Sequence, residues 1–342
     1  MKTISKPGRE SASATLLEVA REAGVSAATV SRILNGSSRV SAEKRQAVER
    51  AIKALNFKPN LLAQSLKRGR SMTVGVLTQD IGSPFFAEAL LGIEAALEHT
   101  DYEPLIASGH WNPGEEADRI RRLVARQVDG VIVLFGHLAD DALAQFAEHV
   151  PIIATGHQFT SPRAISFRLD SHRGGYLATR HLLDLGHRDI AHIAGPSDHA
   201  DAVERLTGYR QALDEAGVRY DERLVVEGNF KEPGGVIAAN RLLDSGVPFT
   251  AIFAANDQTA FGARLALYRR GIRVPEDVSL IGFDDLPSAL YTTPPLTTVR
   301  QPMFEVGQQA AAALLKLIEG EPARVEVPEL TLVVRETTRR LR

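Results

Sequence analysis

Two groups of residues in this chain have types and spacing that could support catalysis or metal binding. Asp284 and Asp285 are adjacent carboxylates, the kind of pair that general acid–base chemistry uses. They adjoin at the end of a predicted strand and should point apart, which favours a ligand contact or a loop cap over a joint catalytic role. His181, His187 and His192 fall in a helix end, a turn and a strand, so a shared metal site is not expected.

The sequence motifs of common enzyme classes are missing from the chain. No two glycines are separated by a single residue, which excludes the GxGxxG motif, and no Gly-Lys dipeptide is present for a Walker A loop. Neither GxSxG nor HExxH occurs. The chain has no cysteine, so neither a disulfide nor a thiolate metal site can form. We therefore expect no catalytic residue, no metal ion and no cofactor.

Charge is divided unevenly along the 342 residues. Residues 1–70 carry 14 Lys and Arg against 5 Asp and Glu, whereas residues 71–342 carry 26 against 37. A basic segment on an acidic body is typical of a nucleic-acid-binding module joined to a domain with another task, although a solvated basic tail is an alternative. The content of 44% hydrophobic and 24% charged residues indicates a globular protein.

The basic segment contains the pattern of a helix-turn-helix. Thr15 and Glu18 form a capping-box pattern at the start of a short helix, which Gly24 ends. Ser26 can cap a second helix through AATVSRIL, and a third helix begins at Ser41. Two helices joined by a short turn that contains glycine present the N-terminal residues of the second helix to the major groove.

The second helix leaves a small set of side chains available to DNA. Val25, Val30 and Ile33 should face inward, and the residues left available are Ala27, Ala28, Thr29, Ser31 and Arg32. The two alanines cannot hydrogen-bond through their side chains, but they can approach a thymine methyl group. The Arg32 guanidinium can bind guanine through two hydrogen bonds, which favours guanine over other bases by about 1–3 kcal/mol. We therefore expect each half-site to keep a guanine.

The segment KPNLLAQSLKRGRS predicts a conditional hinge helix, with an ordinary linker as the alternative. Helices shorter than about 12 residues are marginal alone in water, so this one should fold only when something packs on it. Leu66 beside Lys67 suits binding in a minor groove. An apolar side chain there can insert between neighbouring base pairs, while a cationic side chain pairs with the phosphates.

The remaining residues alternate between apolar strands, such as GVIVLF, and amphipathic helices. This alternation predicts parallel sheets covered by helices, with ligands at the carboxyl ends of the strands. About 270 residues are too many for one sheet of usual size, so we expect two doubly wound α/β subdomains with a cleft between them. The longest apolar runs are far below the roughly 18 residues of a membrane helix.

The segment TLLEVAREAGVSAATVSRILNGSSRVSAEKRQAVERAIKALNFKPNLLAQSLKRGRS resembles the DNA-binding domain and hinge of the LacI/GalR family of bacterial repressors. The resemblance continues through VGVLTQDIGSPFFAEALLGIEAAL, LGHRDIAHIAGP, FAANDQTAFGA, VPEDVSLIGFDD and PPLTTVRQP, so it covers the chain from about residue 15 to the end. It implies a small all-α helix-turn-helix domain followed by a periplasmic-binding-protein-like α/β body.

The resemblance sets the expected domain boundaries. A disordered tail (1–14) precedes the helix-turn-helix domain (15–59), the hinge (60–70) and an effector-binding and dimerisation body (71–342). The first subdomain is expected at about 71–165 with 301–326, and the second at about 166–295 with 327–342, with crossovers near 160–172, 292–302 and 325–332. The residues expected to contact DNA are Ser26, Ala27, Ala28, Thr29, Ser31, Arg32, Asn35, Leu66 and Lys67.

The resemblance also implies an effector in the cleft. Its expected contacts are Phe85, Phe86, His199, Asp201, Arg205, Phe230, Asn256, Asp257 and Asp284. Acidic, amide and guanidinium groups beside aromatic faces suit a polyhydroxylated ligand, so a sugar or sugar derivative is favoured over a nucleoside or a small acid. The purine-binding member of the family has arginine and threonine at the positions of His199 and Asp201, which speaks against a purine.

The implied function is a homodimeric transcription factor, expected to repress, that binds a pseudo-palindromic operator in double-stranded DNA. The family contains both induced and corepressed members, and induction is favoured here. The tail RETTRRLR has no heptad repeat, so a tetramer is not expected.

We expect the protein in the bacterial cytoplasm, associated with the nucleoid and not with a membrane. The alternatives are a solute-binding protein, which would need an export signal, and an enzyme with an added DNA-binding domain.

Overall fold

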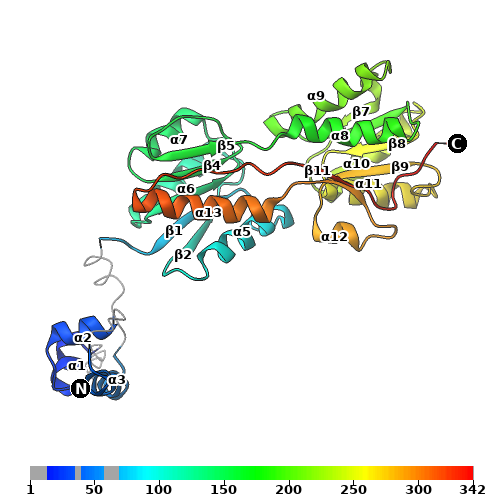
Figure 1. Ribbon diagram of the computed structural model, residues 1–342. Helices are drawn as coiled ribbons and strands as arrows, with labels where there is room; N and C mark the ends of the chain where they lie inside the picture. Colours follow the sequence, from blue (N-terminus) through cyan, green and yellow to red (C-terminus); the bar gives the residue numbers. More distant parts are fainter. Residues whose placement is uncertain (1–13, 35–39, 58–68, 342) are drawn as a thin grey trace, which may run out of the picture. The chain divides into compact units, whose positions relative to one another are not determined.

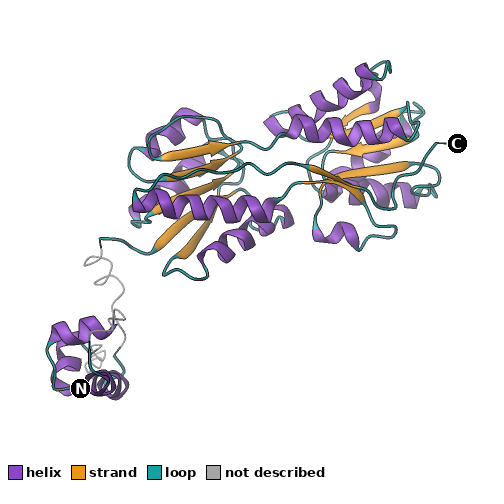
Figure 2. Cartoon of the chain, in the orientation of Figure 1, coloured by secondary structure: helices purple, strands orange, loops and turns teal. Residues whose placement is uncertain are grey.

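The computed structural model describes residues 14–34, 40–57 and 69–341, and the chain divides into two units at residues 71 and 72. Figures 1 and 2 show that the first unit is helical and that the second contains two sheets, each with its own helices. We call the first unit the head and the second the body. None of the described helices is long and apolar enough to cross a membrane.

The head is a three-helix core made by α1 (Leu16–Glu22), α2 (Ala27–Leu34) and α3 (Ala42–Ala54). The predicted capping box is confirmed, since Glu18 N–H donates to Thr15 Oγ1 (3.3 Å) and Thr15 N–H donates to Glu18 Oε2 (2.7 Å). Each helix contributes one fully buried valine to the shared core: Val19, Val30 and Val48. The apolar spacing of the sequence thus determines which face of α2 is left to solvent.

The first subdomain of the body is a parallel sheet with the strand order β2-β1-β3-β4-β5. Its strands are β1 (Thr73–Thr78), β2 (Glu103–Ser108), β3 (Gly130–Leu134), β4 (Ile152–Thr155) and β5 (Ala164–Phe167). Its helices are α5 (Pro84–Leu97), α6 (Pro113–Ala125), α7 (Asp140–Ala147) and α13 (Met303–Glu319). Strand β3 is buried along its whole length because helices cover both faces of the sheet, as its unbroken apolar run predicts.

The second subdomain has the strand order β11-β10-β9-β8-β6-β7, in which only β11 runs antiparallel to its neighbour. Its strands are β6 (Ile190–Ala194), β7 (Val225–Glu227), β8 (Ala251–Ala254), β9 (Ser279–Asp284), β10 (Thr297–Arg300) and β11 (Thr331–Val333). Its helices are α8 (Ser171–Asp184), α9 (Ala200–Glu215), the 3-10 turn η1 (Glu222–Leu224), α10 (Glu232–Asp244), α11 (Asp257–Arg269) and α12 (Pro287–Leu290).

The chain passes between the two subdomains three times (Figure 1). It crosses between β5 and α8, between β10 and α13, and between α13 and β11. The second crossing contains Gln301, which lines the cavity described below. The short strands β5 and β11 were not among the predicted strands, since each is three or four residues long and partly exposed.

Candidate functional site

Helix α2 presents a narrow exposed face. Ser26, Ala28 and Arg32 are exposed, whereas Ala27, Thr29 and Ser31 are half-buried. Ala27 packs partly against the core of the head. Thr29 N–H donates to Ser26 Oγ (3.2 Å), and the two hydroxyl oxygens lie 2.9 Å apart. The Ser26 side chain therefore caps the start of the helix. Arg32 is the one exposed side chain among the predicted α2 contacts that carries a charge.

Three predicted DNA contacts, Asn35, Leu66 and Lys67, lie outside the described residues, as does most of the predicted hinge. Their roles stay predictions from the sequence.

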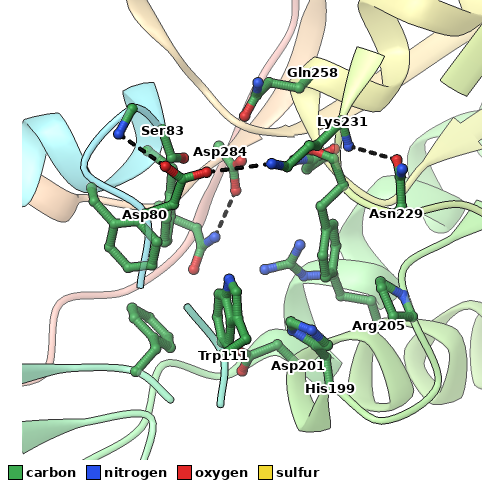
Figure 3. Close-up of a pocket in the computed structure, with 18 residues that line it drawn as sticks. Asp80, Ser83, Trp111, His199, Asp201, Arg205, Asn229, Lys231, Gln258 and Asp284 are labelled. Atoms are coloured by element: carbon green, nitrogen blue, oxygen red, sulfur yellow. Dashed lines mark hydrogen bonds and ion pairs between the residues drawn. The ribbon is translucent and has the colours of Figure 1, made fainter. Parts of the chain in front are cut away.

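A cavity of about 310 Å³ lies between the two subdomains of the body (Figure 3). Residues that follow the carboxyl ends of strands in both sheets line it, as predicted for parallel α/β sheets. The lining residues are Asp80, Gly82, Ser83, Phe85, Phe86, Trp111, Phe135, Pro196, His199, Asp201, Arg205, Asn229, Phe230, Lys231, Asn256, Gln258, Asp284 and Gln301. Eight of the nine residues expected to bind an effector are among them.

The ninth, Asp257, does not line the cavity. Its side chain is fully buried, its Oδ1 accepts from Thr298 Oγ1 (2.6 Å), and its Oδ2 accepts from Leu286 N–H (2.8 Å). Burial, and next the charge of Asp284, raise the pKa of Asp257. The structure corrects the expectation for this residue: from the first turn of α11 its carboxylate is directed inward, where it joins strand β10 to the start of α12.

One wall of the cavity is aromatic. The Phe85 ring lies 5.2 Å from Phe86 and 5.6 Å from Phe135, and Trp111 lies 6.1 Å from Phe86. From the other subdomain, Phe230 lies 5.4 Å from His199. Rings held by such mutual edge contacts keep fixed orientations and offer apolar faces to a ligand.

Arg205 is buried and rigidly held on the opposite side. Its guanidinium lies 3.8 Å above the Phe283 ring and donates to the Ala255 carbonyl (2.6 Å). A Cβ on Gly175 would come within 2.2 Å of the Arg205 carbonyl oxygen, so glycine there lets α8 approach the helix that carries Arg205. Figure 3 shows the side chain reaching toward the middle of the cavity, where its remaining N–H groups can meet ligand oxygens.

Asp284 and Asp285 point in different directions, as their position at a strand end predicts. Asp284 Oδ1 accepts from Gln301 Nε2 (2.7 Å) at the cavity, whereas Asp285 pairs with Arg300 (2.7 Å) and Arg335 (2.6 Å). Both residues have positive φ, 116° and 59°, a backbone strain that separates the two carboxylates. Burial raises the pKa of Asp284 to about 7 although the Arg205 charge and the Gln301 hydrogen bond oppose the shift.

Asn256 and His199 begin helices at the cavity. Asn256 Oδ1 accepts from Thr259 N–H (2.9 Å) and its Nδ2 donates to the Phe230 carbonyl (2.9 Å), so this side chain is largely engaged within the protein. His199 is the N-cap of α9, and its ring lies 4.3 Å from that of Trp111. Burial, followed by the neighbouring His137, lowers the pKa of His199.

The sequence did not identify several lining residues: Asp80, Trp111, Phe135, Lys231, Gln258 and Gln301. Asp80 follows the predicted strand MTVGVLT and Phe135 ends the predicted strand GVIVLF, so the rule that ligands bind at strand ends could have found them. Trp111, the only tryptophan of the chain, follows β2 in a loop whose neighbours depend on the sheet order.

The histidines His181, His187 and His192 have separate partners in the structure. His181 contacts Thr338 Oγ1 (2.9 Å), His187 contacts Thr250 Oγ1 (2.8 Å), and His192 contacts the Phe253 carbonyl (2.9 Å). Each ring therefore makes its own hydrogen bond within the fold, and the three partners differ.

Comparisons with known proteins match both units. The model of bacterial regulatory proteins of the lacI family matches residues 15–60, and the periplasmic binding protein-like domain matches residues 179–338. The ribose operon repressor of Haemophilus influenzae is 37% identical, covering 95% of this chain and 98% of that protein. The transcriptional repressor PurR of Vibrio atlanticus is 36% identical, covering 96% and 99%.

Solved structures agree over nearly the same length. A lac repressor dimer bound to operator and the anti-inducer ONPF matches with a TM-score of 0.85 at 30% identity, covering 95% of this chain and 99% of that one. A complex of the regulator CelR with cellobiose matches with a TM-score of 0.69 at 39% identity, with the same coverage. These relatives are transcriptional regulators, and the chain belongs to the LacI family of bacterial DNA-binding regulators.

Proposed function

We propose that this chain represses transcription as a homodimer on a pseudo-palindromic operator, and that a neutral sugar in the body cavity changes its affinity for that operator. The observation that supports a sugar as the ligand is the composition of the cavity, where aromatic rings lie opposite a buried arginine and several carboxylate and amide groups.

The two kinds of lining match the two faces of a sugar. The C–H face of a pyranose or furanose stacks on rings such as Phe85 and Trp111, and its hydroxyls need both donors and acceptors. Arg205 supplies donors and Asp284 supplies acceptors, while Gln301 can do both.

Charge at the cavity favours a neutral ligand. Three carboxylates, Asp80, Asp201 and Asp284, oppose two cations, Arg205 and Lys231. Lys231 is paired with Asp80 at 3.4 Å, which leaves Arg205 beside two acids. A phosphate or a carboxylate ligand would meet no surplus of positive charge in this cavity. A hydroxyl group, in contrast, can donate a hydrogen bond to a carboxylate and accept one from arginine or lysine.

Names among the relatives support a sugar but also a second candidate. The CelR structure is a complex with cellobiose, and one relative is a ribose operon repressor. A purine is the second candidate, because the family that this chain resembles includes a purine-binding member. The presence of His199 and Asp201, where the purine-binding member has arginine and threonine, favours the sugar.

The head supports sequence-specific binding with few polar base contacts. Arg32 is the proposed reader of guanine, and the alanines at 27 and 28 leave neighbouring base pairs unconstrained or inclined to thymine. The lac repressor dimer on its operator supports a dimeric arrangement. Such a regulator acts in the bacterial cytoplasm, on the nucleoid, and the ligand signals through the body.

The ligand class is tested by thermal unfolding of the full chain with a panel of cellobiose, galactose, ribose, guanine and hypoxanthine. A ligand at 100 times its Kd should stabilise the body by about 2.7 kcal/mol. At least one sugar should raise the unfolding temperature, and Arg205→Lys should reduce that shift. Stabilisation by purines alone would replace the sugar with the second candidate.

A further inference from the structure

A second cluster of ligating side chains lies at the edge of the cavity. The ligand atoms of His137, Asp198 and His199 all lie within 4.8 Å of one another, and His199 Nε2 is 3.8 Å from Asp198 Oδ1. Among the described residues this is the one group of at least three histidine or acidic side chains with such a spacing.

The cluster draws on both subdomains. His137 lies in the loop after β3 of the first subdomain, and its ring is 4.6 Å from that of His199. Asp198 and His199 lie in the loop between β6 and α9 of the second subdomain. A ligand held by both loops would therefore tie the subdomains together at this point.

His137 is held in place but lacks a partner for its ring. Its main-chain N–H donates to the Glu116 carboxylate (2.9 Å), which also accepts from Leu138 N–H (2.8 Å), so the loop is fixed from below. The Nε2 atom of His137 is buried and has no hydrogen-bond partner within the described parts of the chain. A buried polar atom without a partner is costly, and a ligand at this atom would account for it.

We propose that His137, Asp198 and His199 bind one divalent transition-metal ion of the zinc type and that this ion links the two subdomains beside the effector cavity. Two imidazoles and one carboxylate form a nitrogen and oxygen set that suits zinc, cobalt or nickel rather than magnesium or calcium. Three protein ligands leave a fourth position for water.

The side chains need only small movements to coordinate the ion. Ligand atoms in a tetrahedral zinc site lie about 3.3 Å apart, given bond lengths near 2.0 Å. The Asp198 side chain is 74% exposed, and the His199 side chain is 13% exposed with its ring 4.6 Å from that of His137. His137, whose main chain is held by Glu116, thus provides the anchor, and the exposed Asp198 side chain completes the site.

Trp111 provides a built-in probe of this site. It is the only tryptophan in the chain, and its ring lies 5.3 Å from His137 and 4.3 Å from His199. Figure 3 shows the rings of Trp111 and His199 next to each other at the border of the cavity. A paramagnetic ion bound to either histidine would lie close enough to quench the fluorescence of Trp111.

The test titrates the full, untagged chain with ZnCl₂, CoCl₂ and MgCl₂ after removal of metals with a chelator, in the absence of sugar. We expect saturable one-site quenching of Trp111 fluorescence by Co²⁺, its reversal by competing Zn²⁺, and no response to Mg²⁺. His137→Gln and Asp198→Asn should each weaken the apparent affinity by about 10- to 100-fold. His149→Gln removes an exposed histidine outside the cluster and should leave the titration unchanged.

Two outcomes would overturn the proposal. One is the absence of a saturable change in Trp111 fluorescence with Co²⁺ and Zn²⁺. The other is a titration of Asp198→Asn that superimposes on that of the original chain, and this variant should keep its fold because the Asp198 side chain is mostly exposed. In either case His137 merely packs against Trp111 and His199.

Discussion

Lys231 Nζ lies 3.4 Å from Asp80 Oδ2, so one ion pair joins the two subdomains at the cavity (Figure 3). Lys231 follows β7 and Asp80 follows β1. The lysine side chain is 64% exposed and the aspartate side chain 40% exposed, so the pair contributes little to overall stability. Because both side chains line the cavity, the pair can help to hold the two subdomains in the arrangement that a ligand meets.

Removal of this pair should weaken ligand binding at low salt without unfolding the body. An exposed pair is worth about 0–1 kcal/mol, so Lys231→Met should lower the affinity for the effector by up to about fivefold. The difference should disappear near 1 M salt, where the screening length is about 3 Å. Calorimetric titration at two salt concentrations measures both quantities. The charge-reversed pair Asp80→Lys with Lys231→Asp serves as the control and should recover part of the loss, and a loss independent of salt would contradict this account.

Arg205 should determine the response to the effector more than any other side chain in the cavity. A hydrogen bond to a charged group contributes about 1.5–3 kcal/mol, so Arg205→Met should lower the affinity for the effector by about 10- to 150-fold. Operator binding without effector should be retained, since Arg205 lies in the body. Titration of a labelled operator with and without effector measures both properties. If Arg205→Met still responds at the original effector concentration, Arg205 does not contact the ligand.

Asp284 should make the stability of the body depend on pH. Burial raises its pKa to about 7, whereas in the unfolded chain it ionises near its ordinary value of about 3.9. Between these values the folded protein binds more protons than the unfolded one, so the free energy of unfolding contributed by this group falls as the pH rises. Asp284→Asn removes the contribution, and its stability relative to the original chain should rise from pH 4 to pH 7 and then stay constant.

Urea unfolding at pH 4.5, 6.0 and 7.5 measures that relative stability. Asp80→Asn is the matched control, because its carboxylate is partly exposed at the other side of the cavity. A difference between Asp284→Asn and the original chain that does not change with pH would show that Asp284 titrates normally in the fold.

Arg32 should supply most of the polar base discrimination of the head. Arg32→Ala should abolish the preference for guanine at one position of each half-site, a loss of about 1–3 kcal/mol there. Preferences at other positions should persist. Selection of binding sites from a random DNA library with both proteins measures this, and Lys44→Ala on the exposed side of α3 is a suitable control. Sites from Arg32→Ala that keep the guanine would show that another residue reads it.

Local sequence patterns were sufficient to predict the helices of the head and the alternation of strands and helices in the body. The capping box at Thr15 and Glu18 depends on residues three apart, and it is present as predicted. The position of the cavity at the strand ends followed from the parallel topology. Most of the eight expected contacts that line it follow a strand or start a helix there, whereas Arg205 lies within α9 and Asp284 ends β9.

Contacts that depend on how distant segments meet could not be predicted. Asn256 and Asp257 look equivalent in sequence, but Asn256 is the N-cap of α11, and Asp257, one residue later, turns inward to Thr298 and Leu286. Trp111 reaches His199 only because the loops after β2 and β6 meet at the cavity. No local pattern encodes either relationship.

The central claim is that a sugar in the cavity controls the binding of operator DNA by the head. It is tested most directly by fluorescence anisotropy of an operator selected from the genome, titrated with the full chain at several salt concentrations, with and without each ligand of the panel. The account predicts an affinity that falls steeply with salt and that one sugar changes by roughly 5- to 150-fold, with the change lost in Arg205→Met. An operator affinity that no sugar alters, or that only a purine alters, would contradict it.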